Sequence, residues 1–137
     1  MVSRAWSRTS AADKASFNPV IGTVRSGQNV TAYVAYSSLA TNLVMGGSAV
    51  QQVYLSTVSP TGAVSTILVS KNPETGAPGL AASDFPDISS DGNFIVFESI
   101  ARNLTETSSV FKDVYLYDVA QNQMFLVSQS PTGFPAS

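Results

Sequence analysis

The sequence predicts an all-β protein built from two four-stranded antiparallel units. Three observations lead to this fold class. Short runs of β-branched, aromatic and other apolar residues recur along the 137 residues, and turn residues separate them. These runs form two sets of four that resemble each other in order and spacing. Lys, Arg, Asp and Glu make up only 12% of the chain, a low share for a protein with long surface helices.

The two sets are related by an internal repeat. The segment Ala35–Leu43 reads AYSSLATNL, and it returns at Val96–Leu104 as VFESIARNL. Val53-Tyr54-Leu55 returns as Val114-Tyr115-Leu116, and both pairs of segments are 61 residues apart. Repetition on this scale marks a unit that buries its core by stacking on copies of itself.

The first unit contains four β-forming runs, each bounded by turn residues. Gly27 and Gly62 supply two of the turns, in the segments SGQN and SPTG, and a loop follows Asn42. The expected strands are Pro19–Val24, Val30–Ser37, Gln51–Thr57 and Val64–Ser70.

The second unit repeats this order after a linker at Asn72–Ala82 that is rich in Pro, Gly and Ala. Asp91-Gly92 between two β-forming runs is a strong hairpin signal, because glycine takes a positive φ at little cost. Connections are short, so consecutive strands should pair as an antiparallel meander. The expected strands are Phe85–Ser89, Phe94–Ser99, Asp113–Asp118 and Met124–Ser128.

Partial copies of the unit are expected at both ends of the chain. Val2-Ser3-Arg4 matches Val69-Ser70-Lys71, and Thr132–Pro135 echoes Thr75–Pro78. We therefore expect two repeats of a longer array. The predicted division is 1–16 for the end of a preceding blade, 17–71 for the first blade, 72–84 for a linker, 85–129 for the second blade and 130–137 for the start of a following linker. Units of four strands with a period near 60 favour propeller blades over a sandwich or a barrel.

The second unit resembles the blade motif of TolB-like, WD-repeat-like β-propellers. The resemblance rests on Pro86–Ser99, PDISSDGNFIVFES, and on Asp113–Asp118, DVYLYD. The first unit departs from the motif, because a longer turn at Gly22–Gln28 replaces Ser-x-Asp-Gly and Gln52 stands where the second has Asp113. The resemblance implies a periplasmic or extracellular location and a role as binding platform, scaffold or accessory domain of an enzyme.

Composition excludes several kinds of chemistry. The chain has no histidine and no cysteine, which excludes His-based triads, disulfides and thiolate metal sites. The net charge is −2 without a basic cluster, so no nucleic-acid partner is expected. No apolar run is long enough for a membrane span, and the N-terminus lacks the apolar core of a signal peptide. We expect no catalytic residue, no metal and no cofactor.

Three groups of residues have both a functional and a structural interpretation. Asp84, Asp87, Asp91 and Glu98 could hold calcium or form a carboxylate pair, but their spacing does not match an EF-hand and turn roles are favoured. Asn42 and Asn103 recur at one repeat position, where a turn role is favoured over ligand contact; Asn29 and Asn103 also begin N-glycosylation triplets. The paired aromatics could stack on sugars, although packing between units is favoured: Tyr33, Tyr36, Tyr54, Phe94, Phe97 and Tyr115.

These observations favour a non-catalytic scaffold that binds protein, either neighbouring blades or other copies of the chain. Two alternatives stay open: an accessory propeller domain of a hydrolase, and a two-blade subunit that assembles into a ring or filament. Tyr54 and Tyr115 should be at least partly buried. Most of the buried side chains should come from Val34, Tyr36, Val53, Leu55, Ile95, Phe97, Val114 and Leu116.

Overall fold

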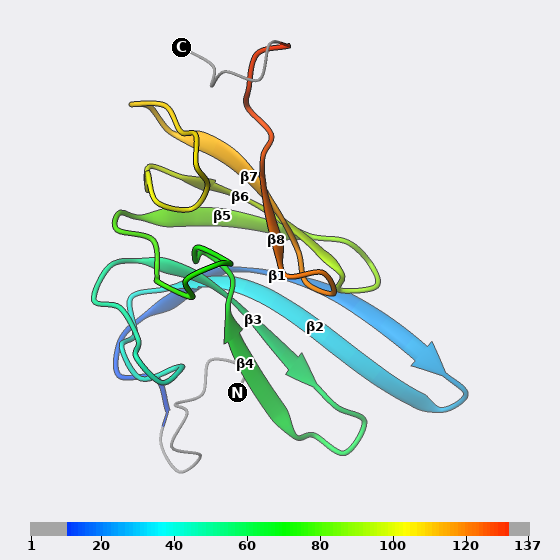
Figure 1. Ribbon diagram of the computed structural model, residues 1–137. Coiled ribbons are helices and arrows are strands. Elements are labelled where there is room, and N and C mark those ends of the chain that lie inside the picture. Colours follow the sequence, from blue (N-terminus) through cyan, green and yellow to red (C-terminus); the bar gives the residue numbers. More distant parts are fainter. Residues whose placement is uncertain (1–10, 132–137) are drawn as a thin grey trace.

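A computed structural model describes residues 11–131. Within this range the backbone forms strands, turns and loops, and none of it is helical. Eight strands build two four-stranded sheets in which consecutive strands pair antiparallel (Figure 1). The predicted all-β class and the meander order within each unit are confirmed. The expected copies at Val2–Arg4 and Thr132–Pro135 lie outside the described residues.

The first sheet begins with a long hairpin. Strands β1 (Ser16–Ser26) and β2 (Asn29–Ser38) stay paired as far as the turn at Gly27, which has a φ of 62°. This hairpin reaches past the other strands at the right of Figure 1. The strand predicted over 19–24 was therefore too short. The sheet consists of β1 (Ser16–Ser26), β2 (Asn29–Ser38), β3 (Gln52–Val58) and β4 (Val64–Leu68).

The second sheet has shorter strands and the same order. Its members are β5 (Ser83–Ile88), β6 (Phe94–Ser99), β7 (Asp113–Asp118) and β8 (Gln123–Leu126). Gly92, with a φ of 76°, turns the β5–β6 hairpin as predicted.

The fourth strand of each sheet ends two residues earlier than predicted. The N–H groups of Val69 and Ser70 both donate to the carbonyl oxygen of Val53, so these residues leave the regular ladder. Val127 and Ser128 do the same at the carbonyl oxygen of Val114.

The first strand of each sheet contains a bulge at the same place. The register of β1 shifts between Phe17 and Val20, and Asn18 there has a φ of 53°. The register of β5 shifts between Asp84 and Asp87, and Phe85 has a φ of 51°. A positive φ is uncommon outside glycine, so its recurrence at one repeat position shows that the bulge belongs to the unit.

The two sheets pack face to face through a shared core. Strand β5 lies against β1, β2 and β3 (Figure 1). Buried side chains from both sheets meet in one cluster that contains Ala35, Val53, Leu55 and Val69 from the first sheet and Ile95, Phe97, Tyr115, Tyr117 and Leu126 from the second. A second cluster lies on the opposite face of the first sheet, around Tyr36, Tyr54 and Leu68.

Five of the eight predicted core residues are buried, but the expectation that these eight supply most of the buried side chains was wrong, because most buried residues lie outside the set. Tyr36, Val53, Leu55, Ile95 and Phe97 are buried, and Tyr54 and Tyr115 are fully buried. Val34, Val114 and Leu116 are only partly buried, so their assignment to the core was wrong. In β7 the buried side chains are Asp113, Tyr115 and Tyr117, which alternate with Val114 and Leu116 on the other face.

Candidate interaction surface

The same pattern of hydrogen bonds and ring contacts recurs within each of the two sheets. Tyr54 Oη donates to the carbonyl oxygen of Ala40 at 3.5 Å, and Tyr115 Oη donates to that of Ala101 at 3.3 Å. The ring of Tyr54 stacks on Tyr36, as that of Tyr115 stacks on Phe97. Aromatic pairs of this kind stabilise the fold beyond the area that they bury.

Serine side chains repeat the correspondence at the strand ends. The Ser16 hydroxyl donates to Ser38 Oγ, and the Ser83 hydroxyl donates to Ser99 Oγ. The N–H of Val53 donates to Ser70 Oγ, which bonds Gln52, whereas the N–H of Val114 donates to Ser128 Oγ, which bonds Asp113. Two residues, one from each sheet, are called equivalent when they occupy matching positions in this pattern and in the strand register.

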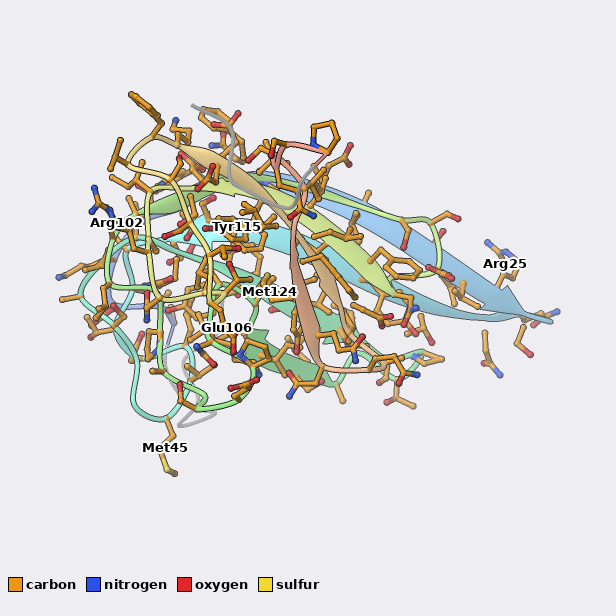
Figure 2. All side chains as sticks on the ribbon, turned by 45° about the horizontal axis from the view of Figure 1, so that its top comes forward. Arg25, Met45, Arg102, Glu106, Tyr115 and Met124 are labelled. Carbon is orange, nitrogen blue, oxygen red and sulfur yellow. The ribbon has the colours of Figure 1, made fainter. Side chains whose placement is uncertain are left out.

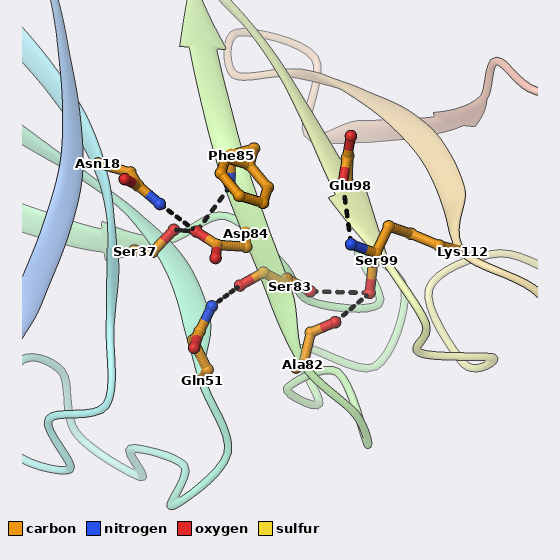
Figure 3. A network of polar contacts seen from close by, with 10 residues as sticks. All are labelled: Asn18, Ser37, Gln51, Ala82, Ser83, Asp84, Phe85, Glu98, Ser99 and Lys112. Carbon is orange, nitrogen blue, oxygen red and sulfur yellow. Dashed lines mark hydrogen bonds and ion pairs between the residues drawn. The ribbon is translucent and has the colours of Figure 1, made fainter.

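A polar junction links the two sheets at one edge of their shared core (Figure 3). Asp84 Oδ1 accepts hydrogen bonds from the Ser37 hydroxyl at 2.5 Å, from Asn18 Nδ2 at 2.9 Å and from the N–H of Phe85 at 2.7 Å. Burial raises the pKa of Asp84, but the bonds from Ser37, Asn18 and the Phe85 N–H outweigh it and hold this pKa below its ordinary value. Beside them, the N–H of Ser83 donates to the carbonyl oxygen of Gln51 at 3.0 Å.

The second sheet presents an uncovered apolar face on the side away from the first sheet. Register places Val96, Leu116 and Phe125 side by side across β6, β7 and β8. Their equivalents in the first sheet are Ala35, Leu55 and Ile67, and the first two of these are buried in the shared core. Val96 and Leu116 are partly exposed, and Phe125 is 47% exposed.

The contrast is greatest at the end of the fourth strands. Val69 is 0% exposed and belongs to the shared core, whereas its equivalent Val127 is 52% exposed. A row of apolar side chains on an open sheet face is a feature of interaction sites. Here "outer face of the second sheet" means Val96, Val114, Leu116, Phe125 and Val127.

Charged side chains border this face. Lys112 Nζ lies 3.1 Å from Glu98 Oε2 and 5.7 Å from the centre of the Phe85 ring, which is itself exposed. Asp87 and Asp118 occupy the places next to Val96 and Phe94 in the strand register. An apolar centre with a polar border is the usual anatomy of a protein interface.

The acidic residues considered for calcium do not converge. Asp84 lies in the polar junction, and Asp91 accepts bonds from Ser89 and from the N–H of Asn93 within the β5–β6 turn. Those bonds, first that of Ser89, lower the pKa of Asp91. Glu98 pairs with Lys112. Over residues 11–131, no three Asp, Glu, His or Cys side chains form a group that could hold a metal ion.

Asn42 and Asn103 perform one structural task in both units. Asn42 Oδ1 accepts from the N–H of Asp13, and its Nδ2 donates to the carbonyl oxygen of Ala11. Asn103 Oδ1 accepts from the N–H of Leu80, and its Nδ2 donates to the carbonyl oxygen of Pro78. Each amide thus fastens the segment before the first strand to the loop after the second. Both residues therefore have a structural role, although their bonds reach a distant segment instead of closing a local turn.

The aromatic side chains divide between packing and exposure. Tyr36, Tyr54, Phe97 and Tyr115 are buried, as the packing interpretation predicts. Phe94 is partly exposed, and the ring of Tyr33 lies beneath Gly92 of the neighbouring hairpin. Two small hollows border the linker: one of about 170 Å³ beside Pro73 and Met124, the other of about 300 Å³ beside Met45 and Ile67.

Sequence reasoning missed the outer face of the second sheet. In the sequence, Val127 resembles Val69 at the end of a fourth strand. Only the structure shows that Val127 is exposed whereas Val69 is buried. No protein-family model, curated protein or solved structure matches the chain. Among residues 11–131 there is no helix long and apolar enough to cross a membrane.

Proposed function

We propose that this chain is a non-catalytic scaffold made of TolB-like propeller blades, and that it binds protein through the outer face of the second sheet. The proposal includes an origin in an exported protein of bacterial type. The observation that carries it is the 52% exposure of Val127, at a position where its equivalent Val69 is fully buried in the shared core. The first sheet packs this face against protein, so the equivalent face of the second sheet is suited to bind protein as well.

Two further features support a scaffold built of blades. Four-stranded meanders that stack face to face in chain order are the building plan of propellers. The tyrosines whose pKa burial raises most, Tyr54 and Tyr115, bond backbone carbonyl oxygens, so their hydroxyls serve the fold.

Photo-crosslinking in cells that produce the protein tests the proposal. The photoreactive residue p-benzoylphenylalanine is placed at position 125, on the outer face of the second sheet. A matched probe replaces Met45, which is 77% exposed on a loop and points away from the sheets in Figure 2. We expect a light-dependent protein adduct at position 125 that is absent at position 45.

The identity of the adduct separates the alternatives. Any defined protein partner at position 125 supports the scaffold, and a hydrolase as partner would favour the accessory-domain role. Equal background labelling at both positions would contradict the proposal.

A further inference from the structure

The molecule carries both halves of its own inter-sheet interface at opposite ends, and the half on the first sheet is uncovered only in part, because Tyr36, Tyr54 and Leu68 are buried there. One half is the outer face of the second sheet, which corresponds to the covered face of the first. The other half lies on the first sheet, on the side away from the second. Its residues correspond to those that the second sheet presses into the shared core.

Two pairs of equivalent residues define this second half. Ile88 and Ile95 are neighbours across β5 and β6, where Ile95 is fully buried in the shared core and Ile88 packs against it. Ile21 and Val34 are the corresponding neighbours across β1 and β2. Ile21 is 65% exposed and Val34 is partly exposed. Ile21 therefore lacks the apolar cover that its equivalent Ile88 has.

Charge distinguishes the two halves of the chain. Residues 11–71 carry three basic side chains and one acidic, a net charge of +2; Lys71 lies over the Tyr117 ring of the second sheet, whereas Arg25 lies towards the far end of the long hairpin (Figure 2). Residues 72–131 carry two basic and eight acidic side chains, a net charge of −6. Contact between a first sheet and a second sheet brings opposite charges together, whereas contact between two second sheets brings Asp87, Glu98 and Asp118 close to their own copies.

We infer that a second copy of this chain docks head to tail: its first sheet covers the outer face of the second sheet and repeats the interface seen within the molecule. This inference rests on the proposed function and names its partner. The contact is heterologous, so each copy keeps one free half and can bind a further copy. Such contacts close into a ring or continue as a filament.

Two variants block one half each. Val127→Lys places a cation on the face that meets the basic first sheet, and Ile21→Glu places an anion on the face that meets the acidic second sheet. Both side chains are more than half exposed, so the fold should survive, as an unchanged melting temperature would show. Val24→Glu is the matched control, since Val24 lies on the same strand as Ile21, is exposed, and points to the opposite face.

Sedimentation velocity at micromolar concentration reads out the assembly. Wild type and Val24→Glu should form species larger than a dimer of the 14.4 kDa chain. Val127→Lys and Ile21→Glu should each be monomeric, because each lacks one half of the interface. An equimolar mixture of the two should form a two-chain species, since one supplies an intact second sheet and the other an intact first sheet. Raising the salt concentration from about 50 mM to about 500 mM should raise the dissociation constant of this two-chain species several-fold.

The mixture is the decisive sample. A monomeric wild type, or two variants that fail to combine, would overturn the inference. A wild type that forms only a two-fold dimer would overturn it as well. If the protein is monomeric but position 125 still crosslinks to a different protein in cells, the inference fails while the proposed function stands. If neither contact is found, both fail.

Discussion

Val69 and Val127 directly follow the fourth strand of equivalent units, yet Val69 is completely buried and Val127 is half exposed. Their backbones are held alike, since each N–H donates to the carbonyl oxygen of the equivalent valine on the third strand, Val53 or Val114. The difference lies only in what covers them. Val69 lies in the core that the two sheets share, and none of residues 11–131 covers Val127 to the same extent.

Burial of Phe97 should dominate the stability of the second sheet. Phe97→Ala removes a side chain that is 1% exposed and stacked 5.8 Å from Tyr115, so it should lower the free energy of unfolding by about 3–5 kcal/mol. Phe125→Ala is the matched control on the exposed face of the same sheet and should change it by less than about 1 kcal/mol. Urea denaturation measures both. Equal losses would contradict the assignment of the two faces.

Gly92 should tolerate no side chain while Tyr33 lies beneath it. A Cβ at Gly92 would come 2.2 Å from the Tyr33 ring, and its φ of +76° already disfavours other residues. Gly92→Ala should therefore lower the free energy of unfolding by roughly 2–4 kcal/mol. At Gly27, with a φ of +62° and open space, alanine should cost only about 1 kcal/mol. In a Tyr33→Ala background the penalty at Gly92 should fall towards that of Gly27; an unchanged penalty would refute the clash.

Asp84 should stabilise the junction between the sheets only while it is ionised. Because its folded pKa lies below the ordinary value, its contribution is present above about pH 4 and is lost as pH falls through the folded pKa. Asp84→Asn should lower the free energy of unfolding at pH 7 by about 1 kcal/mol, a modest figure because the carboxylate is partly solvated. Denaturation from pH 7 to pH 2 should show wild type and variant converging. A constant difference would argue against an ionised acceptor.

Tyr54 and Tyr115 should make the fold sensitive to alkali. Burial raises the pKa of each to about 12, whereas the pKa of a tyrosine in an unfolded chain is about 10. Their contribution is therefore complete below about pH 10 and is lost as pH rises towards about 12. The double variant Tyr54→Phe/Tyr115→Phe should lose less free energy of unfolding over this range than wild type. Parallel curves would show that these hydroxyls are not the cause.

Much of the fold could be read from the sequence because local signals and the repeat agree. Asp91-Gly92 specifies a hairpin by its backbone preference alone, and the structure has that hairpin. The sequence did not show which face of β7 is buried. Val114, Tyr115, Leu116 and Tyr117 are all apolar or aromatic, so no alternation of polar and apolar residues distinguishes the two faces. The uncovered face could not be read either, since Val69 and Val127 sit in nearly identical sequence and differ only in their neighbours.

Oxidative cross-linking of single-cysteine variants tests the central claim most directly, because the chain has no cysteine of its own. Ser37 and Asp84 touch across the sheets within one molecule, and their equivalents at a head-to-tail contact are Glu98 of one copy and Phe17 of the next. The double variant Ser37→Cys/Asp84→Cys is the control and should close within the chain, because the Ser37 and Asp84 side chains are in direct contact across the sheets. We predict that a mixture of Glu98→Cys and Phe17→Cys forms the mixed disulfide well above either homodimer. A control that closes while the mixture stays at the homodimer background would contradict the repeated interface.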